Sequence, residues 1–121
     1  PVDPDASARR LQEEIEQRTR MRVAVIISDT FGRPWRLGLT NVAIGAAGLR
    51  VLRDYRNTRD RVGKRLRTTV VAVADELAAA AGLVMEKTAG IPVVLIRGYT
   101  FEPGAEGARE IIRSQEQDLF P

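Results

Sequence analysis

The chain has 121 residues, of which 44% are hydrophobic and 29% are charged, and its formal net charge is +3. This composition is that of one globular domain with a modest core. The sequence contains neither cysteine nor histidine, which excludes disulfides, thiolate metal sites, cysteine nucleophiles and Ser-His catalysis, so that any metal ion must take oxygen ligands such as those of Mg²⁺ or Mn²⁺.

The first predicted element is a surface helix over residues 3–20. Asp3 can cap its first turn. Ala8, Leu11 and Ile15 recur at helical spacing and form one narrow apolar stripe, while charged residues occupy the other faces.

Two strands and a loop are expected next. Residues 22–27, "RVAVII", predict a strand that is covered on both faces, because its apolar residues do not alternate with polar ones. Ser28 to Pro34 is expected to form a loop, which Gly32 and Pro34 punctuate. Residues 41–52 predict a second strand, packed closely through small residues, with a short helix as the alternative.

The middle of the chain is strongly basic. Residues 53–67 predict a charged hairpin with a turn at Gly63. Between Arg33 and Arg67 there are ten Lys or Arg residues and two acids, which leaves +8, whereas the rest of the chain carries −5. This asymmetry indicates a surface that faces an anion, and a solvated surface without a partner is the alternative. Nucleic acid is the less favoured anion, because no aromatic-rich stacking platform accompanies the charge.

The clearest predicted helix covers residues 68–87, capped by Thr68 or Thr69. Its apolar stripe comprises Val70, Val73, Leu77, Ala81 and Val84, with Ala74 and Ala78 beside it. Residues 92–98 predict another strand covered on both faces, and residues 105–113 a short helix. We therefore expect an α+β fold, a mixed sheet with a long buried helix, whose core is completed by another part of the molecule or by a partner.

No membrane association is expected. No apolar run approaches the roughly 20 residues that span a bilayer, and no signal peptide is recognisable. The lack of cysteine fits a reducing, cytoplasmic location. The opening "PVDPD" has no initiator Met, which indicates a processed piece or an expressed part of a longer protein.

Asp29 and Thr30 directly follow the first predicted strand, where a rigid scaffold holds functional groups at the rim of a fold. Their carboxylate, hydroxyl and carbonyl oxygens suit Mg²⁺ or Mn²⁺, which shares its other positions with water and phosphate. Arg33 and Arg36 can neutralise phosphate charge through bidentate hydrogen bonds. The alternative is an ordinary turn in which an arginine pairs with Asp29.

Three further features have structural interpretations. Trp35 is expected to anchor the core or a subunit interface, with base or ring stacking as the alternative. The "GAAG" of residues 45–48 lacks the spacing and the lysine of a P-loop, so close backbone packing is the favoured reading. Lys87, at the end of the long helix, can complement the helix dipole instead of binding a ligand.

Two long stretches, "VAVIISDTFGRPWRLGLTNVAIGAAGL" and "ADELAAAAGLVMEKTAGIPVVLIRG", resemble the coenzyme F-420-0:L-glutamate ligase family, and the resemblance covers nearly the whole chain. Members of this family use GTP to join L-glutamate to the phospholactate end of a deazaflavin coenzyme precursor, with release of GDP and phosphate. They require Mg²⁺ or Mn²⁺ and form dimers. The resemblance therefore implies these substrates, this cofactor and a homodimer.

The resemblance also implies site residues. Asp29 and Thr30 match the metal-binding Asp-Thr of the family, and Arg33 and Arg36 follow as catalytic residues that screen phosphate. The segment that matches the lining of the guanine nucleotide comprises Met85, Glu86, Lys87, Thr88, Ala89, Gly90 and Ile91.

This sequence departs from the family pattern in three respects. The family shows a small residue in place of Glu86 and commonly Asp in place of Asn41, and its ligase domain is about twice as long. Residues 1–121 are thus expected to be the carboxy-terminal part of a coenzyme F-420-0:gamma-glutamyl ligase-like domain, inactive without the amino-terminal half. The alternative functions are a non-catalytic basic module that binds RNA or another polyanion, and a structural remnant.

Overall fold

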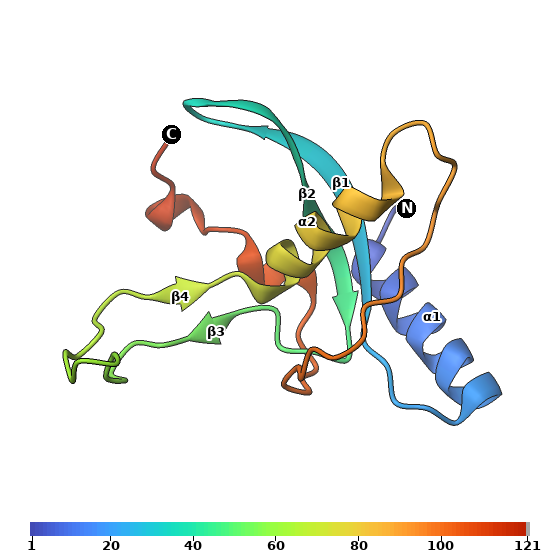
Figure 1. The fold of residues 1–121 in the computed structure, drawn as a ribbon, viewed down its shortest axis with the longest axis horizontal. Coiled ribbons are helices and arrows are strands. Elements are labelled where there is room, and N and C mark those ends of the chain that lie inside the picture. Colours follow the sequence, from blue (N-terminus) through green and yellow to red (C-terminus); the bar gives the residue numbers. More distant parts are fainter. Residues whose placement is uncertain (121) are drawn as a thin grey trace.

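The computed structural model describes residues 1–120, and Figure 1 shows the arrangement of their helices and strands. The α+β class is confirmed, and the strands form two separate antiparallel pairs in place of one sheet. None of the helices in residues 1–120 is long and apolar enough to cross a bilayer. In chain order the elements are α1 (Pro4–Thr19), β1 (Val25–Arg33), β2 (Arg36–Ala47), β3 (Arg53–Asp54), β4 (Val70–Val71), α2 (Val73–Met85) and the 3₁₀ helices η1 (Ala108–Ile111) and η2 (Gln115–Gln117).

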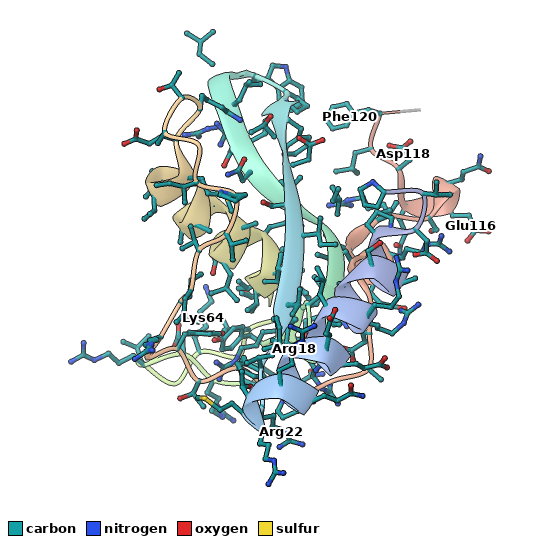
Figure 2. The ribbon with its side chains drawn as sticks, turned by 90° about the vertical axis from the view of Figure 1, so that its right-hand side faces the viewer. Arg18, Arg22, Lys64, Glu116, Asp118 and Phe120 are labelled. Atoms are coloured by element: carbon teal, nitrogen blue, oxygen red, sulfur yellow. The ribbon has the colours of Figure 1, made fainter. Side chains whose placement is uncertain are left out.

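Helix α1 begins as predicted. The side chain of Asp3 caps it by accepting a hydrogen bond of 3.1 Å from the backbone N–H of Ala6. Its buried face differs from the predicted stripe, because Asp5 and Ala8 are buried while Leu11 remains 47% exposed. The helix contacts β1 and β2, and Figure 2 shows Arg18 in its last turn and Arg22 beyond its end.

The loop predicted for residues 28–34 is wrong. Strand β1 continues through these residues to Arg33 and pairs with β2, and Pro34 and Trp35 form a two-residue hairpin turn. Trp35 has a φ of 59°, which is the positive value that the second central residue of a type II turn adopts after a proline. It is 90% exposed rather than buried in the core, and its ring lies 5.3 Å from that of Phe120. Residues 41–47 belong to β2, which confirms the strand and rejects the short helix.

Residues 53–71 form an arm that projects away from the rest of the chain (Figure 1). The predicted hairpin is confirmed by the pairing of β3 with β4 and by a turn in which Gly63 N–H donates to the carbonyl of Asp60 at 3.0 Å. Hydrogen bonds from the side chain of Arg56, and then from its backbone N–H, lower the pKa of Asp54 to about 2. Lys64, which Figure 2 labels, directly follows Gly63 in this turn.

Helix α2 is shorter than predicted. It starts at Val73 with no side-chain cap, so the predicted caps Thr68 and Thr69 are wrong. Val70 and Val71 instead pair with β3, because a strand partner was available to them. The buried face of α2 comprises Val73, Ala74 and Ala78.

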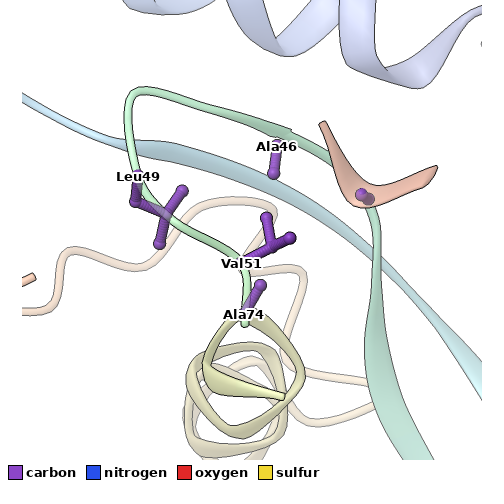
Figure 3. Packing of buried hydrophobic residues seen from close by; sticks show 5 residues of the cluster. Ala46, Leu49, Val51 and Ala74 are labelled. Atoms are coloured by element: carbon purple, nitrogen blue, oxygen red, sulfur yellow. The ribbon is translucent and has the colours of Figure 1, made fainter. Parts of the chain in front are cut away.

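The core lies where β2, the segment after it, α2 and η1 meet. Figure 3 shows its buried side chains, which belong to Ala46, Leu49, Val51, Ala74 and Ala108. Small residues dominate, so the backbones lie close together. At Gly45 a Cβ would collide with the backbone of Pro4, which supports the expectation that this glycine-containing run serves close packing.

A buried carboxylate joins three elements at the edge of this core. Asp5 is 6% exposed, and its Oδ1 accepts hydrogen bonds from the backbone N–H of Ala46 at 2.9 Å and of Ala108 at 2.7 Å. Asp5 therefore connects α1, β2 and η1 with a single side-chain atom.

The predicted strand over residues 92–98 is wrong, because no ladder includes these residues in the part of the chain that the structure describes. Val93 and Leu95 are 78% and 69% exposed, so the expected cover on both faces is missing as well. A strand needs a neighbouring backbone, and residues 1–120 offer none here. The helix predicted for residues 105–113 contracts to η1.

Candidate functional site

An open pocket of about 290 Å³ lies between the β1–β2 hairpin and the end of α2. One wall comes from residues 26–30 of β1 together with Asn41 of β2. The other wall comes from residues 85–87, Ile91 and Pro92, which end and follow α2. The pocket thus combines carboxylate, hydroxyl, amide and ammonium groups with several aliphatic side chains.

Asp29 and Thr30 lie in this pocket on β1, between two register shifts of its ladder, rather than on a loop. Asp29 is exposed, and its Oδ1 accepts a hydrogen bond of 2.7 Å from the backbone N–H of Thr30. Within residues 1–120 no ion pair joins Asp29 to an arginine. The alternative in which an arginine merely pairs with this aspartate is therefore not supported.

The second wall is formed where α2 stops. Glu86 caps the helix with a φ of 55° and a ψ of −169°, and its backbone N–H donates to the carbonyl of Gly82 at 3.2 Å. Residues with side chains rarely adopt a positive φ, and glycine does so without strain. The small residue that the sequence resemblance leads us to expect at the position of Glu86 would adopt this conformation without strain.

Of the predicted nucleotide-binding segment, the structure brings Met85, Glu86, Lys87 and Ile91 into the pocket wall. The intervening Thr88, Ala89 and Gly90 are exposed and do not line the pocket. Lys87 lies beyond the last residue of α2, so its ammonium group is available to the pocket.

Arg33 and Arg36 are not brought to the pocket. They face each other in the ladder at the closed end of the hairpin. A strand advances about 3.3 Å per residue, so Arg33 lies some four steps, or roughly 13 Å, beyond Asp29. The Nε atom of Arg33 is buried and has no hydrogen-bond partner among the described residues.

Asn41 was not predicted as a site residue, yet it lines the pocket opposite Thr30 in the ladder. A regular hairpin around "GRPWR" would place Thr30 opposite Leu39, so the pairing with Asn41 depends on the register shift between Phe31 and Arg33, which the sequence does not reveal. Ser28 and Pro92 also line the pocket without having been predicted.

The position of α2 relative to the hairpin depends on two contacts. Asp75 Oδ1 accepts a hydrogen bond of 2.9 Å from the backbone N–H of Ala43, which attaches the first turn of α2 to β2. Near the other end of the helix, Gly82 lies so close to the side chain of Asn41 that a Cβ would collide with the amide Nδ2. These contacts set the separation of the two pocket walls.

We expect the effect of Gly82→Ala on stability to depend on Asn41. Alanine should stabilise the helix by about 1 kcal/mol relative to glycine, but its methyl group must displace the amide of Asn41. In the Asn41→Ala background, Gly82→Ala should raise the free energy of unfolding, as measured by urea denaturation. In the wild-type background this increase should be smaller by at least about 1 kcal/mol, which is the size of coupling found between residues in contact. Equal effects in both backgrounds would show that this contact does not position the helix.

The fold and the pocket define an α+β protein with an open polar site between a β-hairpin and a helix end. The sequence model of the family "F420-0:Gamma-glutamyl ligase" matches residues 1–98, a range that includes both pocket walls. The chain belongs to this family.

Individual relatives agree with this assignment. The chain is 48% identical, over 99% of its length and 49% of the relative, to the coenzyme F420:L-glutamate ligase of Methanocaldococcus jannaschii. It is 47% identical to the proteins of the same name from Methanothermobacter thermautotrophicus and Methanopyrus kandleri, again over 99% of this chain and 49% and 50% of those proteins. The chain thus spans about half the length of the curated relatives that it matches.

Proposed function

We propose that this chain forms the carboxy-terminal half of a GTP-dependent coenzyme F-420-0:L-glutamate ligase. Family membership supports the reaction class, and one structural observation supports the site. Asp29 and Thr30 on the hairpin line the same pocket as residues 85–87 at the end of α2, although the two segments lie far apart in the sequence. A homodimer and a cytoplasmic location are part of the same proposal.

The donor set of the pocket fits a Mg²⁺ or Mn²⁺ ion. The exposed carboxylate of Asp29 and the oxygens of Thr30 are hard ligands of the kind that these ions prefer. Within the described residues there is no group of three His, Cys, Asp or Glu side chains that could hold an ion alone. The remaining ligands would come from phosphate, water or the rest of the ligase domain. A bound ion would offset phosphate charge during transfer.

The proposed reaction forms an amide through an acyl phosphate. A carboxylate oxygen of the precursor attacks the γ-phosphorus of GTP, and GDP leaves with the electron pair of the broken P–O bond. The amine of L-glutamate then attacks the acyl carbon, phosphate leaves, and the amine proton passes to solvent. The chain chiefly positions and screens the reactants, which explains why neither histidine nor cysteine is needed.

Within this scheme Lys87 acts as a point charge toward the nucleotide phosphates. The proposed screening by Arg33 and Arg36 requires the substrate phosphates to reach the closed end of the hairpin, outside the pocket of this chain. These two arginines are therefore the less well supported part of the site.

A thermal-shift titration with Mn²⁺ and GDP together tests the proposal. A ligand that binds only the folded chain stabilises it by about 2.7 kcal/mol when the free ligand concentration is about 100 times the dissociation constant. We expect the melting temperature to rise clearly with Mn²⁺ and GDP together and to rise less with either component alone. Ligase activity should be absent from the isolated chain, and robust γ-glutamyl transfer by these 121 residues would refute the incomplete-site part of the proposal.

The basic arm favours one second candidate, a module that binds a polyanion such as RNA. Its Lys and Arg residues are exposed, namely Arg53, Arg56, Arg59, Arg61, Lys64, Arg65 and Arg67. A thermal shift caused by RNA but not by Mn²⁺ and GDP, and fading steeply with salt, would favour this function over ligation.

A further inference from the structure

Two arginines face each other at the closed end of the β1–β2 hairpin. Arg33 and Arg36 are partners in the ladder, and such partners point to the same face with their Cβ atoms about 5 Å apart. Like charges placed directly opposite each other destabilise a strand pair. Within residues 1–120 neither arginine forms an ion pair, and the buried Nε of Arg33 has no acceptor. This arrangement is that of an anion-binding site.

The turn between these arginines presents the only tryptophan of the chain. Trp35 has a φ of 59°, which large side chains rarely adopt and which is typical of residues held in place at ligand-binding sites. Figure 2 shows Phe120 beside the end of the hairpin, and the planes of the two rings are inclined by 59°, so they do not stack. Trp35 remains 90% exposed. Its ring therefore offers a flat surface next to two positive charges.

The same end of the hairpin also exposes apolar side chains. Leu37 directly follows Arg36 and is fully exposed, and Phe31 and Leu39 are exposed as well. An inorganic anion makes no use of such a surface, whereas an organic phosphate with an aromatic ring system uses both the charge and the apolar area. A second copy of the chain fits less well, because a two-fold contact at this end would bring four arginines together.

We propose that the closed end of the hairpin binds the acceptor substrate of the ligase, a planar heterocycle joined to a phosphodiester. The ring stacks on Trp35, and the phosphate lies between the guanidinium groups of Arg33 and Arg36, which bind phosphate through paired hydrogen bonds. The proposal rests on the proposed function, because that function supplies the class of acceptor. It assigns the two arginines to the phosphate of the acceptor and not to those of the nucleotide.

The ladder gives the bound acceptor a direction. The register shift near the turn adds its extra residues to β2, so Asp29, Phe31 and Arg33 alternate regularly along β1 and share one face of the hairpin. Asp29 belongs to the pocket. An acceptor held at Arg33 therefore directs its free carboxylate along this face, past Phe31, toward Asp29. The hairpin then binds the acceptor at its closed end and the ion farther along.

Flavin mononucleotide (FMN) tests the proposal, because it joins a planar ring system to a phosphate, and riboflavin is the same compound without the phosphate. Quenching of Trp35 emission, corrected for absorption by the flavin, reports binding at the turn. The fluorescence anisotropy of the flavin reports affinity in variants without tryptophan. We expect saturable quenching by FMN and at least about tenfold weaker binding of riboflavin, which is the contribution of a charge-assisted hydrogen bond.

Three variants separate the two parts of the site. Arg33→Gln and Arg36→Gln should each weaken FMN binding at least about tenfold and should reduce its advantage over riboflavin. Trp35→Ala should weaken the binding of both compounds by the same factor. Arg36 is exposed, so its variant keeps the test valid if Arg33→Gln, which changes a half-buried side chain, does not fold. Arg61→Gln is the matched control on the β3–β4 arm and should bind FMN like the wild type.

Equal affinities for FMN and riboflavin, absence of saturable quenching, or equal losses in Arg36→Gln and Arg61→Gln overturn the proposal. Displacement of FMN by GDP also overturns it, because the arginines would then belong to the nucleotide. Trp35 emission that changes with protein concentration but not with FMN would reveal a contact between copies, and it overturns the proposal too. The proposed function fails through the response to Mn²⁺ and GDP together, which FMN binding does not require, so the two failures are distinguishable.

Discussion

Replacement of Asp29 by Asn is expected to abolish the stabilisation that Mn²⁺ and GDP together give to the chain. The substitution removes the charged oxygen donor from the pocket but keeps an oxygen that can accept the hydrogen bond from the Thr30 N–H. Asp29 is exposed on β1, so the fold should not change. We expect Mn²⁺ to bind at least about tenfold more weakly, which corresponds to about 1.4 kcal/mol, as measured by thermal shift and calorimetry.

Asp60→Asn serves as the control for this experiment. Asp60 carries the same charge, but it lies in the turn of the arm, where its Oδ1 accepts from the N–H groups of Val62 and Lys64. Asparagine can keep these bonds, so the response to Mn²⁺ and GDP should equal that of the wild type. An unchanged response in Asp29→Asn would remove Asp29 from the site.

Asp5→Ala is expected to have the largest effect on stability. The substitution leaves the buried N–H groups of Ala46 and Ala108 without an acceptor. Each of the two unsatisfied buried groups costs about 1–3 kcal/mol, so the free energy of unfolding should fall by about 2–6 kcal/mol. Urea denaturation measures this change. Asp3→Ala, which removes only the cap of the same helix, should cost about 1 kcal/mol, and equal losses in both variants would contradict the role given to Asp5.

The loss in Asp5→Ala should also depend on pH. Burial raises the pKa of Asp5, but the backbone N–H groups of Ala108, Ala46 and Arg109, together with the charge of Arg109, outweigh it and leave the pKa below its ordinary value. The stability provided by this carboxylate is therefore complete above the ordinary pKa of about 3.9. It is lost as the pH falls through the lower pKa of the folded protein. The difference in the free energy of unfolding between the wild type and Asp5→Ala should become smaller only in strong acid.

Local signals predicted the elements whose structure depends on local interactions. The start of α1 follows from Asp3 and Pro4, and the charged hairpin follows from its polar run and Gly63. The end of α2 was less predictable. Glu86 adopts a positive φ that its residue type does not suggest.

Errors in the prediction arose where pairing is non-local. Asp29 and Thr30 resemble turn residues in isolation, but β2 supplies a partner that extends the strand to Arg33. Val70 fits the predicted helical stripe, but Val70 and Val71 instead pair with β3. Residues 92–98 were predicted as a strand from their composition, yet no described strand lies beside them.

Residues of both pocket walls were predicted from the sequence, but the complete set of residues that line the pocket was not. Sequence comparison suggested Asp29, Thr30 and Lys87, and these residues line one pocket. Asn41 escaped notice because its place opposite Thr30 depends on ladder register, which spacing along the chain does not reveal. Arg33 and Arg36 were grouped with Asp29 because arginine can neutralise phosphate charge, whereas the hairpin carries both residues away from the pocket.

The carboxylate of Asp5 has a consequence for the order of folding. It binds a residue at position 46 and another at position 108, so a contact near the first residue spans almost the whole sequence. Contacts of such long range form late, because loop closure must precede them. During synthesis Asp5 can accept the hydrogen bond of Ala46 first, and its second hydrogen bond must wait until residue 108 has emerged from the ribosome.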